Sequence, residues 1–452
     1  MTRALLLLLC CLGCSSPAPL GPPTAAQTLR VASFQCDATP PLGHRLVGWS
    51  VIMKSVEEPL LLKGIVLDDG RTRYVVAALD WCRLQTGAYD LFRRKLAAAA
   101  GIPELQVAVH CTHTHGAPIA DLSAQTLLDR QPSPPVHLDV AFLKELTNRA
   151  AVALGESLGR MKRFTHVGVG KAKVENYASN RRLPGPDGKV KGRMSSSKDP
   201  ELIAAPEGTI DPWLRTVTLF DGERPLVRMH YYATHPQSHY GTEGSPDVPG
   251  FARARLEKEE GIPHLYFTGC AGNVAAGKYN DGSREARAQL VDRLLTGMTR
   301  AMASTRKSPV SQIEWKTSEV RFALRAERAF SETQLRQDLA DPKAPEVARL
   351  KAALALAWYD RLKDRPGVDC SRLRLGPATI LHLPGEAFVE YQLHAQWLRP
   401  DDFIAVAAYG EGGPGYICMD GSAAEGGYEP TASYVGPPTE ERFKAVLAEL
   451  LQ

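Results

Sequence analysis

The hydrophobic and polar positions of this chain follow two spacings that alternate along most of its length. Runs of β-branched and apolar residues predict buried strands at 73–81, 105–111, 263–270, 377–384 and 402–409. Apolar residues at helical spacing predict helices at 87–101, 139–158, 284–303 and 387–398. The segment 213–235 predicts two strands joined at Asp221-Gly222, a frequent hairpin turn. This order predicts an α/β fold in which mixed β-sheets are flanked by helices.

The segment 331–364 departs from this alternation because it is helical throughout. Ser331 and Gln334 fit a capping box, and Pro342 fits a break between two helices. We find no internal repeat in the sequence. We therefore predict one domain over residues 30–452, with a helical insertion at about 331–364.

The first residues are typical of an export signal. A short apolar run follows Arg3, and it is too short to span a bilayer. The letters "CLGC" resemble a bacterial lipobox in which Cys14 is the lipidated residue, so we expect a signal peptide over 1–14 and a Pro-rich linker over 15–29. We expect an exported lipoprotein of the cell envelope, anchored to the membrane surface through Cys14. Ordinary cleavage, giving a periplasmic or secreted protein, is the alternative.

The composition and net charge of the chain limit the classes of partner that it is expected to bind. The chain has 452 residues, of which 44% are hydrophobic, and its formal net charge of +4 is small for this length. The sequence has no dense Lys/Arg block, so we do not expect nucleic acid as a partner. Six cysteines follow the signal region, namely Cys36, Cys82, Cys111, Cys270, Cys370 and Cys418. An even number in an exported chain permits disulfides, and the alternative is that they are small buried side chains.

Polar residues that can do chemistry follow several of the predicted strands directly. His113 and His115 follow the strand at 105–111, His235 follows the hairpin, and Glu386 follows the strand at 377–384. In α/β folds the crevice beyond the carboxyl ends of strands is where ligands bind. Two histidines and one glutamate leave an open position for water, which is a common arrangement around catalytic zinc.

Residue types alone leave a structural role open for each of these side chains, because a histidine beside a strand is more often hydrogen-bonded within the fold. His235 and His239 imitate the spacing of a helical zinc pair, but Pro236 and the missing glutamate argue against that motif. His113 and His115 would point to opposite sides of an extended chain, so only a curved loop would give them different roles at one site.

Seven segments resemble the catalytic domain of the neutral/alkaline, non-lysosomal ceramidases, in that family's order. They are "THTHGAP" (112–118), "NRR" (180–182), "DPWLRTVTLFD" (211–221), "YATHPQS" (232–238), "FTGCAGNVA" (267–275), "LPGEAF" (383–388) and "GYICMDGSAAEGGYEPTASY" (415–434). They extend over nearly all of residues 30–452. The resemblance implies the fold of that domain, in a divergent bacterial relative, and hydrolysis of the amide between a fatty acid and a sphingoid base.

The resemblance also implies the site residues. A Zn2+ ion would be held by four side chains, namely His113, His235, Glu386 and Tyr416. His115 would handle protons beside the substrate carbonyl, Tyr428 would stabilise the oxyanion, and Arg181 would face the substrate entrance. The implied substrate is a small-molecule or lipid amide, which zinc-activated water would attack.

Three departures from the family bear on the activity. Ala275 stands where the family has a serine associated with catalysis, and Asn273 stands where it has an acid, so a serine nucleophile is excluded at this place. "ICMD" follows Tyr416 in place of the family's usual residues. We also expect no immunoglobulin-like C-terminal domain. Three alternatives stay open: a zinc amidohydrolase acting on ceramide or another N-acyl substrate, a zinc esterase, and a non-catalytic zinc-containing envelope lipoprotein that binds a ligand.

Overall fold

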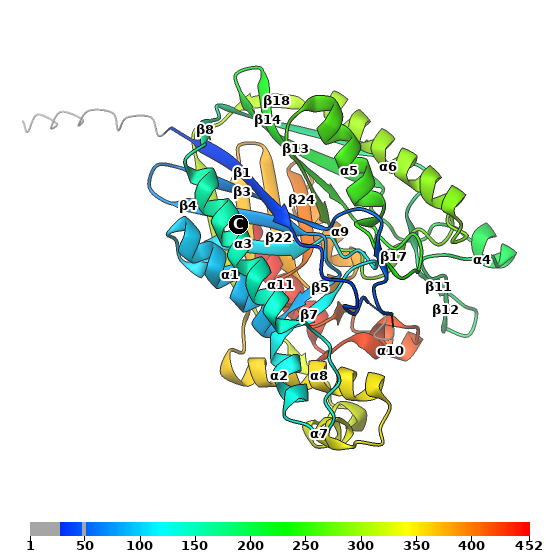
Figure 1. The fold of residues 1–452 in the computed structure, drawn as a ribbon. Helices are drawn as coiled ribbons and strands as arrows, with labels where there is room; N and C mark the ends of the chain where they lie inside the picture. Colours follow the sequence, from blue (N-terminus) through cyan, green and yellow to red (C-terminus); the bar gives the residue numbers. More distant parts are fainter. Residues whose placement is uncertain (1–27, 48–50) are drawn as a thin grey trace, which may run out of the picture.

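Two β-sheets form the framework of the computed structural model, which describes residues 28–47 and 51–452 (Figure 1). The larger sheet has nine strands in the order β19 (Ile313–Val320), β21 (Val368–Leu375), β22 (Ala378–Pro384), β24 (Phe403–Gly410), β6 (Val107–Cys111), β4 (Arg73–Leu79), β3 (Leu61–Asp68), β1 (Arg30–Asp37) and β8 (Lys162–Arg163). The smaller sheet has five, in the order β16 (His264–Thr268), β14 (Arg224–Tyr232), β13 (Trp213–Asp221), β9 (His166–Lys173) and β18 (Arg306–Pro309). Both sheets contain parallel and antiparallel neighbours, which confirms the predicted mixed α/β fold.

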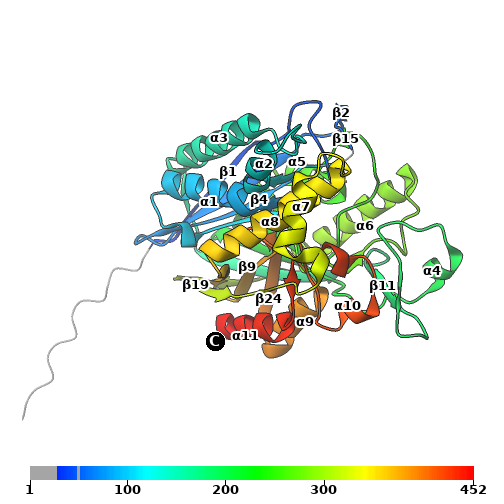
Figure 2. The ribbon, with the colours of Figure 1, turned by 90° about the horizontal axis from the view of Figure 1, so that it is seen from below.

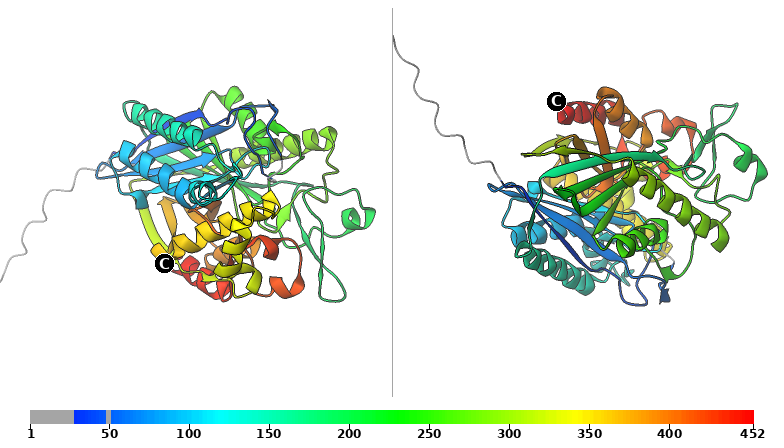
Figure 3. Two further views of the ribbon diagram at one scale, coloured as in Figure 1. Left: turned by 60° about the horizontal axis from the view of Figure 1, so that its bottom comes forward. Right: turned by 90° about the horizontal axis from the view of Figure 1, so that it is seen from above.

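The two sheets pack face to face, and helices cover their outer faces (Figure 3). The core between them contains Ile65 and Val76 from the larger sheet and Val217 and Met229 from the smaller one. The helices on the larger sheet include α1 (Thr86–Ala100), α3 (Val140–Leu158), α9 (Val389–Leu398) and α11 (Thr439–Leu451). Those on the smaller sheet are α5 (Asp247–Glu260) and α6 (Arg284–Ala303). Strands that are buried on both faces have near-continuous apolar runs, which is the pattern the sequence shows.

The predicted helical segment 331–364 forms two helices, α7 (Glu332–Ala340) and α8 (Glu346–Asp364). Ser331 caps α7 by accepting from the backbone N–H of Gln334 at 3.3 Å, whereas the Gln334 side chain bonds to Asp338. Only one half of the predicted capping box therefore forms. Figure 2 shows α8 beside α2 (Leu122–Asp129), and apolar side chains of α8 join the core that covers the larger sheet. That this segment is an insertion stays a prediction.

The predicted signal peptide (1–14), with Cys14, and the linker up to residue 27 lie outside the described residues. Within the described part of the chain, no helix combines the length and apolar character that crossing a membrane requires. The six cysteines found there are free thiols, four of them buried. No disulfide joins these six residues, and the four buried ones match the alternative of small buried side chains.

A buried ion pair links the larger sheet to a helix that covers the smaller sheet. Asp80 follows β4 directly, and its carboxylate oxygens accept from the guanidinium of Arg253 on α5, at 3.0 and 2.7 Å. The same carboxylate accepts from the backbone N–H of Leu61 at 3.1 Å. The Arg253 and Asp80 side chains are only 2% and 1% exposed. Since α5 covers the smaller sheet and Asp80 ends a strand of the larger one, this pair fixes the two sheets relative to each other.

The substitution Arg253→Leu is expected to lower the free energy of unfolding by about 3–5 kcal/mol, because it leaves the Asp80 carboxylate buried without a counter-charge. The double variant Asp80→Asn/Arg253→Leu is expected to recover part of this loss, since it retains neither charge. Chemical denaturation measures both values. Equal losses in the single and double variants would contradict a cost that comes from the unpaired charge.

Candidate metal centre

The chain segments that follow four strands meet at one edge of the two sheets. His113 and His115 follow β6 of the larger sheet, and His235 follows β14 of the smaller one. Glu386 begins β23 (Glu386–Ala387) after β22, and Tyr416 begins β25 (Tyr416–Ile417) after β24. β23 and β25 run parallel, with Glu386 opposite Tyr416. The structure thus brings together the four side chains that the resemblance implies as metal ligands.

The backbone turns sharply at His113, whose φ of 67° lies in the left-handed region. Its N–H donates to the carbonyl of Trp81 at 3.0 Å, which holds the turn in place. Non-glycine residues adopt this conformation at a cost, and often at functional sites. In an extended chain these two side chains would point to opposite sides. The turn brings them to the same side, where the Nε2 atoms of His113 and His115 lie 3.4 Å apart.

Three electron-pair donors face one another at this point. Nδ1–H of His113 donates to the carbonyl of Cys82 at 2.7 Å, and Nδ1–H of His235 donates to the carbonyl of Ala271 at 3.0 Å. A carbonyl oxygen can only accept, so in each neutral ring Nε2 carries the lone pair. The two Nε2 atoms are 2.8 Å apart, and Oε2 of Glu386 lies 3.2 and 3.6 Å from them. Lone pairs this close repel one another unless they share a cation.

The carboxylate of Glu386 is buried, and its neighbours include Arg83 and the imidazoles of His113 and His235. One Nη of Arg83 contacts Oε1. Burial raises the pKa of Glu386, but the charges of Arg83 and His113 outweigh it and hold the pKa well below its usual range. Burial also lowers the pKa of His235 far below its ordinary value, and the charge of His113 adds to this. Both groups are therefore in the unprotonated form that binds metals.

His113 is the group on which this site places a positive charge. Burial disfavours its protonated form, yet the neighbouring Cys82 and the negative charge of Glu386 raise its pKa to about 9. A position that stabilises a proton attracts a divalent cation more strongly. In a tetrahedral site with bonds of about 2.0–2.2 Å, neighbouring ligand atoms lie about 3.3–3.6 Å apart. The observed spacings of 2.8, 3.2 and 3.6 Å lie within about 0.5 Å of this range, so the residues present fit a divalent metal ion.

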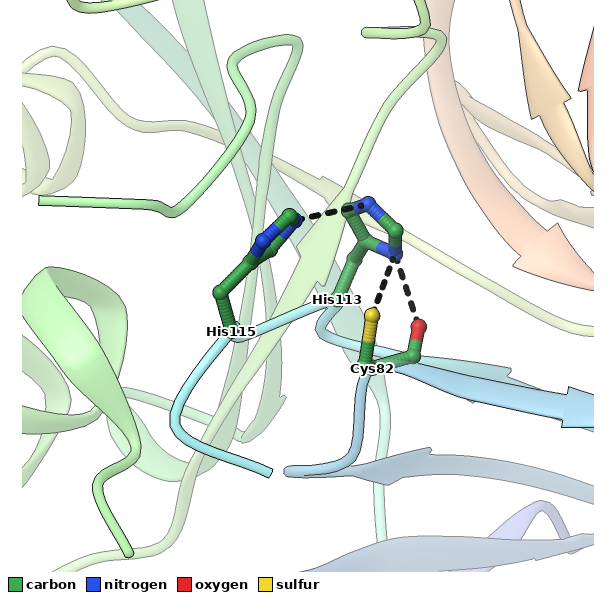
Figure 4. Close-up of side chains that lie close together, drawn as sticks. All are labelled: Cys82, His113 and His115. Carbon is green, nitrogen blue, oxygen red and sulfur yellow. Dashed lines mark hydrogen bonds between the residues drawn. The ribbon is translucent and has the colours of Figure 1, made fainter. Parts of the chain in front are cut away.

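A second group of donor atoms, from Cys82, His113 and His115, overlaps this one (Figure 4). Figure 4 shows Cys82 at the Nδ1 edge of the His113 ring and His115 at the opposite edge; Sγ of Cys82 lies 3.6 Å from Nδ1. Nδ1 already donates to the Cys82 carbonyl. One ion does not use both edges of one imidazole, so the group His113, His235 and Glu386, whose donor atoms converge, is the favoured set.

Tyr416 lies beside this group and is tied to Arg181. Its phenol oxygen accepts from an Nη of Arg181 at 3.0 Å, and its ring is nearly parallel to that of His235, 6.5 Å away between centroids. Arg181 also donates to the carbonyl of Gly272 at 2.7 Å and pairs with Glu429 at 2.9 Å. Arg181 lines the cavity described next, but it is buried and fixed by these partners rather than free at an entrance. The roles of both residues stay predictions.

A cavity of about 650 Å³ reaches this site, and His115 and Tyr428 line it. Nδ1 of His115 is buried without a hydrogen-bond partner among the described residues. Burial lowers the pKa of His115 well below its ordinary value, and the charge of His113 adds to this. Tyr428 is 49% exposed, and its ring stands edge-on to that of Tyr416 at 5.8 Å. A molecule in the cavity therefore meets a neutral imidazole and a phenol beside the metal-binding group.

Ala275 and Asn273, two of the departures from the family's pattern, both take part in contacts that hold the fold together. Ala275 is buried and pairs with Ser179 between β17 (Val274–Ala275) and β10 (Ser179–Asn180). The side chain of Asn273 accepts from the N–H of Val389 at 2.9 Å and donates to Glu390 at 2.8 Å, at the start of α9. Neither side chain supplies a nucleophile, in keeping with the exclusion of a serine mechanism at this place.

Cys82 and Arg83 also line the cavity, and neither was among the candidate residues predicted from the sequence. They follow β4 in the same way that His113 follows β6. The rule that ligands bind beyond the carboxyl ends of strands, applied to this strand as well, would have identified both.

Comparison with known proteins identifies the fold. No protein-family profile and no curated protein sequence matches the chain. The neutral ceramidase from Pseudomonas aeruginosa matches with a TM-score of 0.67 and 16% identity, over 94% of this chain and 74% of that one. A ceramidase complexed with C2 matches with a TM-score of 0.69 and 14% identity, over 94% of this chain and 75% of that one. The protein therefore has a neutral-ceramidase-like fold, which confirms the predicted fold class.

The variants His113→Ala and Glu386→Gln are expected to weaken the binding of a divalent metal ion. The loss should exceed the roughly 10–100-fold that removal of an outer hydrogen-bond partner costs, because each change removes a donor atom itself. Titration calorimetry of chelator-stripped protein with zinc or cobalt measures the affinity. His239→Ala is the control, since His239 lines the cavity outside the group. Metal binding of equal strength in all three variants would refute the assignment.

Glu411 gives the loop that leads to Tyr416 a pH dependence. It is 3% exposed, accepts a hydrogen bond from the hydroxyl of Tyr89, and lies 4.0 Å from a guanidinium nitrogen of Arg93. Burial raises the pKa of Glu411 to about 7, although the charge of Arg93 opposes the shift. The folded state therefore binds a proton more tightly here than the unfolded state does.

The tighter proton binding by Glu411 stabilises the folded state. This contribution to the free energy of unfolding is complete below the pKa of about 4.3 that a glutamate has in the unfolded chain, and it is lost as the pH rises through about 7. From pH 4.5 to 7.5, wild-type protein is expected to lose on the order of 2–3 kcal/mol of unfolding free energy relative to Glu411→Gln, which does not ionise. Denaturant titrations over this range measure the difference. The control is Glu145→Gln, at a side chain 67% exposed, whose curve should parallel that of the wild type; a parallel curve for Glu411→Gln would contradict the prediction.

Proposed function

We propose that the protein is a zinc-dependent hydrolase that cleaves a linear amide with an apolar acyl group. The observation that carries the proposal is the convergence of two imidazole nitrogens and one carboxylate beside a cavity lined by His115, Tyr416 and Tyr428. Two solved structures that share the fold are named ceramidases, which supports an amide substrate.

Zinc suits the donor set best, because it favours tetrahedral sites of nitrogen and oxygen ligands. His113, His235 and Glu386 would hold it, with Tyr416 as the fourth ligand. When bound, such an ion lowers the pKa of a water and polarises a carbonyl. Because Ala275 offers no hydroxyl, water is the nucleophile of this proposal.

The other side chains at the site would transfer protons and stabilise the negative charge that develops in the reaction. His115 is a neutral imidazole with a free nitrogen, so it can accept the proton of the attacking water and pass it to the leaving amine. Tyr428 can donate its O–H to the oxygen of the attacked carbonyl as negative charge develops there. Arg181 holds the phenol oxygen of Tyr416 at 3.0 Å and thereby positions it.

The acyl group has a suitable wall. Six apolar side chains from 329–355 line the cavity, namely Ala329, Phe330, Leu335, Ala348, Ala352 and Ala355. They belong to α7, α8 and the turn before them. Burial of an alkyl chain against such a wall contributes about 0.8 kcal/mol for each CH2. This wall supports a fatty acyl group, and lipid anchoring at Cys14, if the sequence prediction is right, would place the enzyme at the envelope membrane.

The test measures fatty acid release from N-dodecanoyl amides, ceramide and dodecanoyl esters, with and without chelator. We expect about one zinc per chain, and turnover of amides that the chelator abolishes and zinc restores. His115→Ala is expected to lower kcat by about 10²–10⁴ at unchanged zinc content, as loss of a general acid–base does, whereas His394→Ala on α9 serves as the control. Zinc binding without turnover of any substrate would favour a binding protein, and turnover of esters alone would favour an esterase.

A further inference from the structure

Arg83 is a charged residue of the cavity that the proposed mechanism does not use. It begins β5 (Arg83–Gln85), its side chain is 13% exposed, and its guanidinium lies 5.7 Å from the ring centroid of Tyr416. Nε is buried and has no hydrogen-bond partner among the described residues. The carboxylate that Arg83 contacts is that of Glu386, which is also a proposed metal ligand.

Arg181, the other guanidinium at this site, is in a different situation. Its nitrogens donate to Gly272, Tyr416 and Glu429. Glu429 also pairs with Arg182, which pairs in turn with Glu425, so two carboxylates balance these two guanidinium groups. Most of the hydrogen-bonding capacity of the Arg181 guanidinium is therefore used within the protein and is not available to a ligand. Arg83, in contrast, shares the single charge of Glu386 with whatever cation the imidazoles bind.

The charge balance of the loaded site follows from this. A divalent ion, Arg83, Arg181 and Arg182 together bring five positive charges, against the three negative charges of Glu386, Glu425 and Glu429. Even an ionised Tyr416 would leave one positive charge in a largely buried place. Arginine presents a planar fork that matches a carboxylate, and charges in a site of low dielectric attract each other strongly. The loaded cavity therefore favours an anionic ligand over a neutral one.

The position of Arg83 limits where that anion lies on the substrate. Arg83 touches Oε1 of Glu386, and Oε2 of the same carboxylate is 3.2 Å from Nε2 of His113. An anion on Arg83 is thus only a few bonds from the amide that reacts. The acyl chain is the part that suits the apolar wall, so the anion belongs to the amine half. A carboxylate two bonds from the amide nitrogen is that of an N-acylated α-amino acid.

We propose that the substrates are N-acyl amino acids and that Arg83 recognises their carboxylate. This inference rests on the proposed amide hydrolysis and names its substrate class. In the reaction, the C–N amide bond breaks, the oxygen of water joins the acyl carbon, and a proton goes to the nitrogen. The products are a fatty acid and a free amino acid, and no oxidant or co-substrate is needed.

The test compares N-dodecanoylglycine with N-dodecanoylethanolamine, which share the acyl chain and differ in the carboxylate. Wild-type enzyme is expected to favour the glycine amide by at least about tenfold in kcat/KM, mainly through KM. Arg83→Gln should reduce this ratio to within about twofold, and Arg83→Lys should restore part of it, since lysine keeps the charge but loses the fork. Lys351→Gln removes one charge from α8, where Lys351 also lines the cavity, and should leave the ratio within twofold of wild type.

Binding supplies a readout that is independent of turnover. Calorimetry of the zinc-loaded wild type with N-(dodecylsulfonyl)glycine and N-(dodecylsulfonyl)ethanolamine should show tighter binding of the acid, and Arg83→Gln should abolish the difference. Equal binding of the two probes, or a preference for the ethanolamide or ceramide, would overturn the role of Arg83. Loss of zinc in Arg83→Gln would also overturn it, since Arg83 would then only position Glu386. No turnover of any amide, by contrast, would refute the proposed function.

Discussion

The metal centre depends on how closely the two sheets pack, because its two imidazoles come from different sheets. His113 follows a strand of the nine-stranded sheet and His235 a strand of the five-stranded sheet, yet their Nε2 atoms are 2.8 Å apart. The apolar core between the sheets brings these strand ends together, and the Asp80–Arg253 pair fixes them beside the site. A shift of about 1 Å between the layers would remove a donor from reach of a shared ion, since metal–ligand distances vary by only about 0.2 Å.

Much of the fold was readable from periodicity, and the exceptions have physical causes. The helix at 284–303 and the hairpin around Asp221-Gly222 were predicted with nearly the bounds that α6, β13 and β14 have, because their spacing is regular. α5 was missed, since its first turn contains Pro249 and begins at Asp247, whose φ is 51°. The predictions relied on local spacing, which such residues interrupt, whereas packing against the smaller sheet forms this helix regardless.

The candidate site was predictable in part. The strand-end rule located His113, His235 and Glu386, but residue type could not indicate Tyr416, which only the resemblance implied. The convergence of these residues depends on the left-handed turn at His113 and on the pairing of β23 with β25, and neither leaves a signal in spacing. The partners of Arg181 were likewise hidden, because Glu429 lies far along the chain and meets it only in the folded state.

The fold and the substrate are separate questions in this protein. A neutral-ceramidase-like framework supplies the strand ends and the metal-binding group, and such a framework does not by itself determine what is bound. Substrate choice depends on the residues that face the cavity without a structural role. Most charged groups near the site have a structural role, since Arg253 balances Asp80, and Arg181 pairs with Glu429 while it holds Tyr416. Arg83 differs because a bound metal ion would compete with it for the carboxylate of Glu386. The positive charge of Arg83 would then be only partly balanced and could bind an anionic group of the substrate.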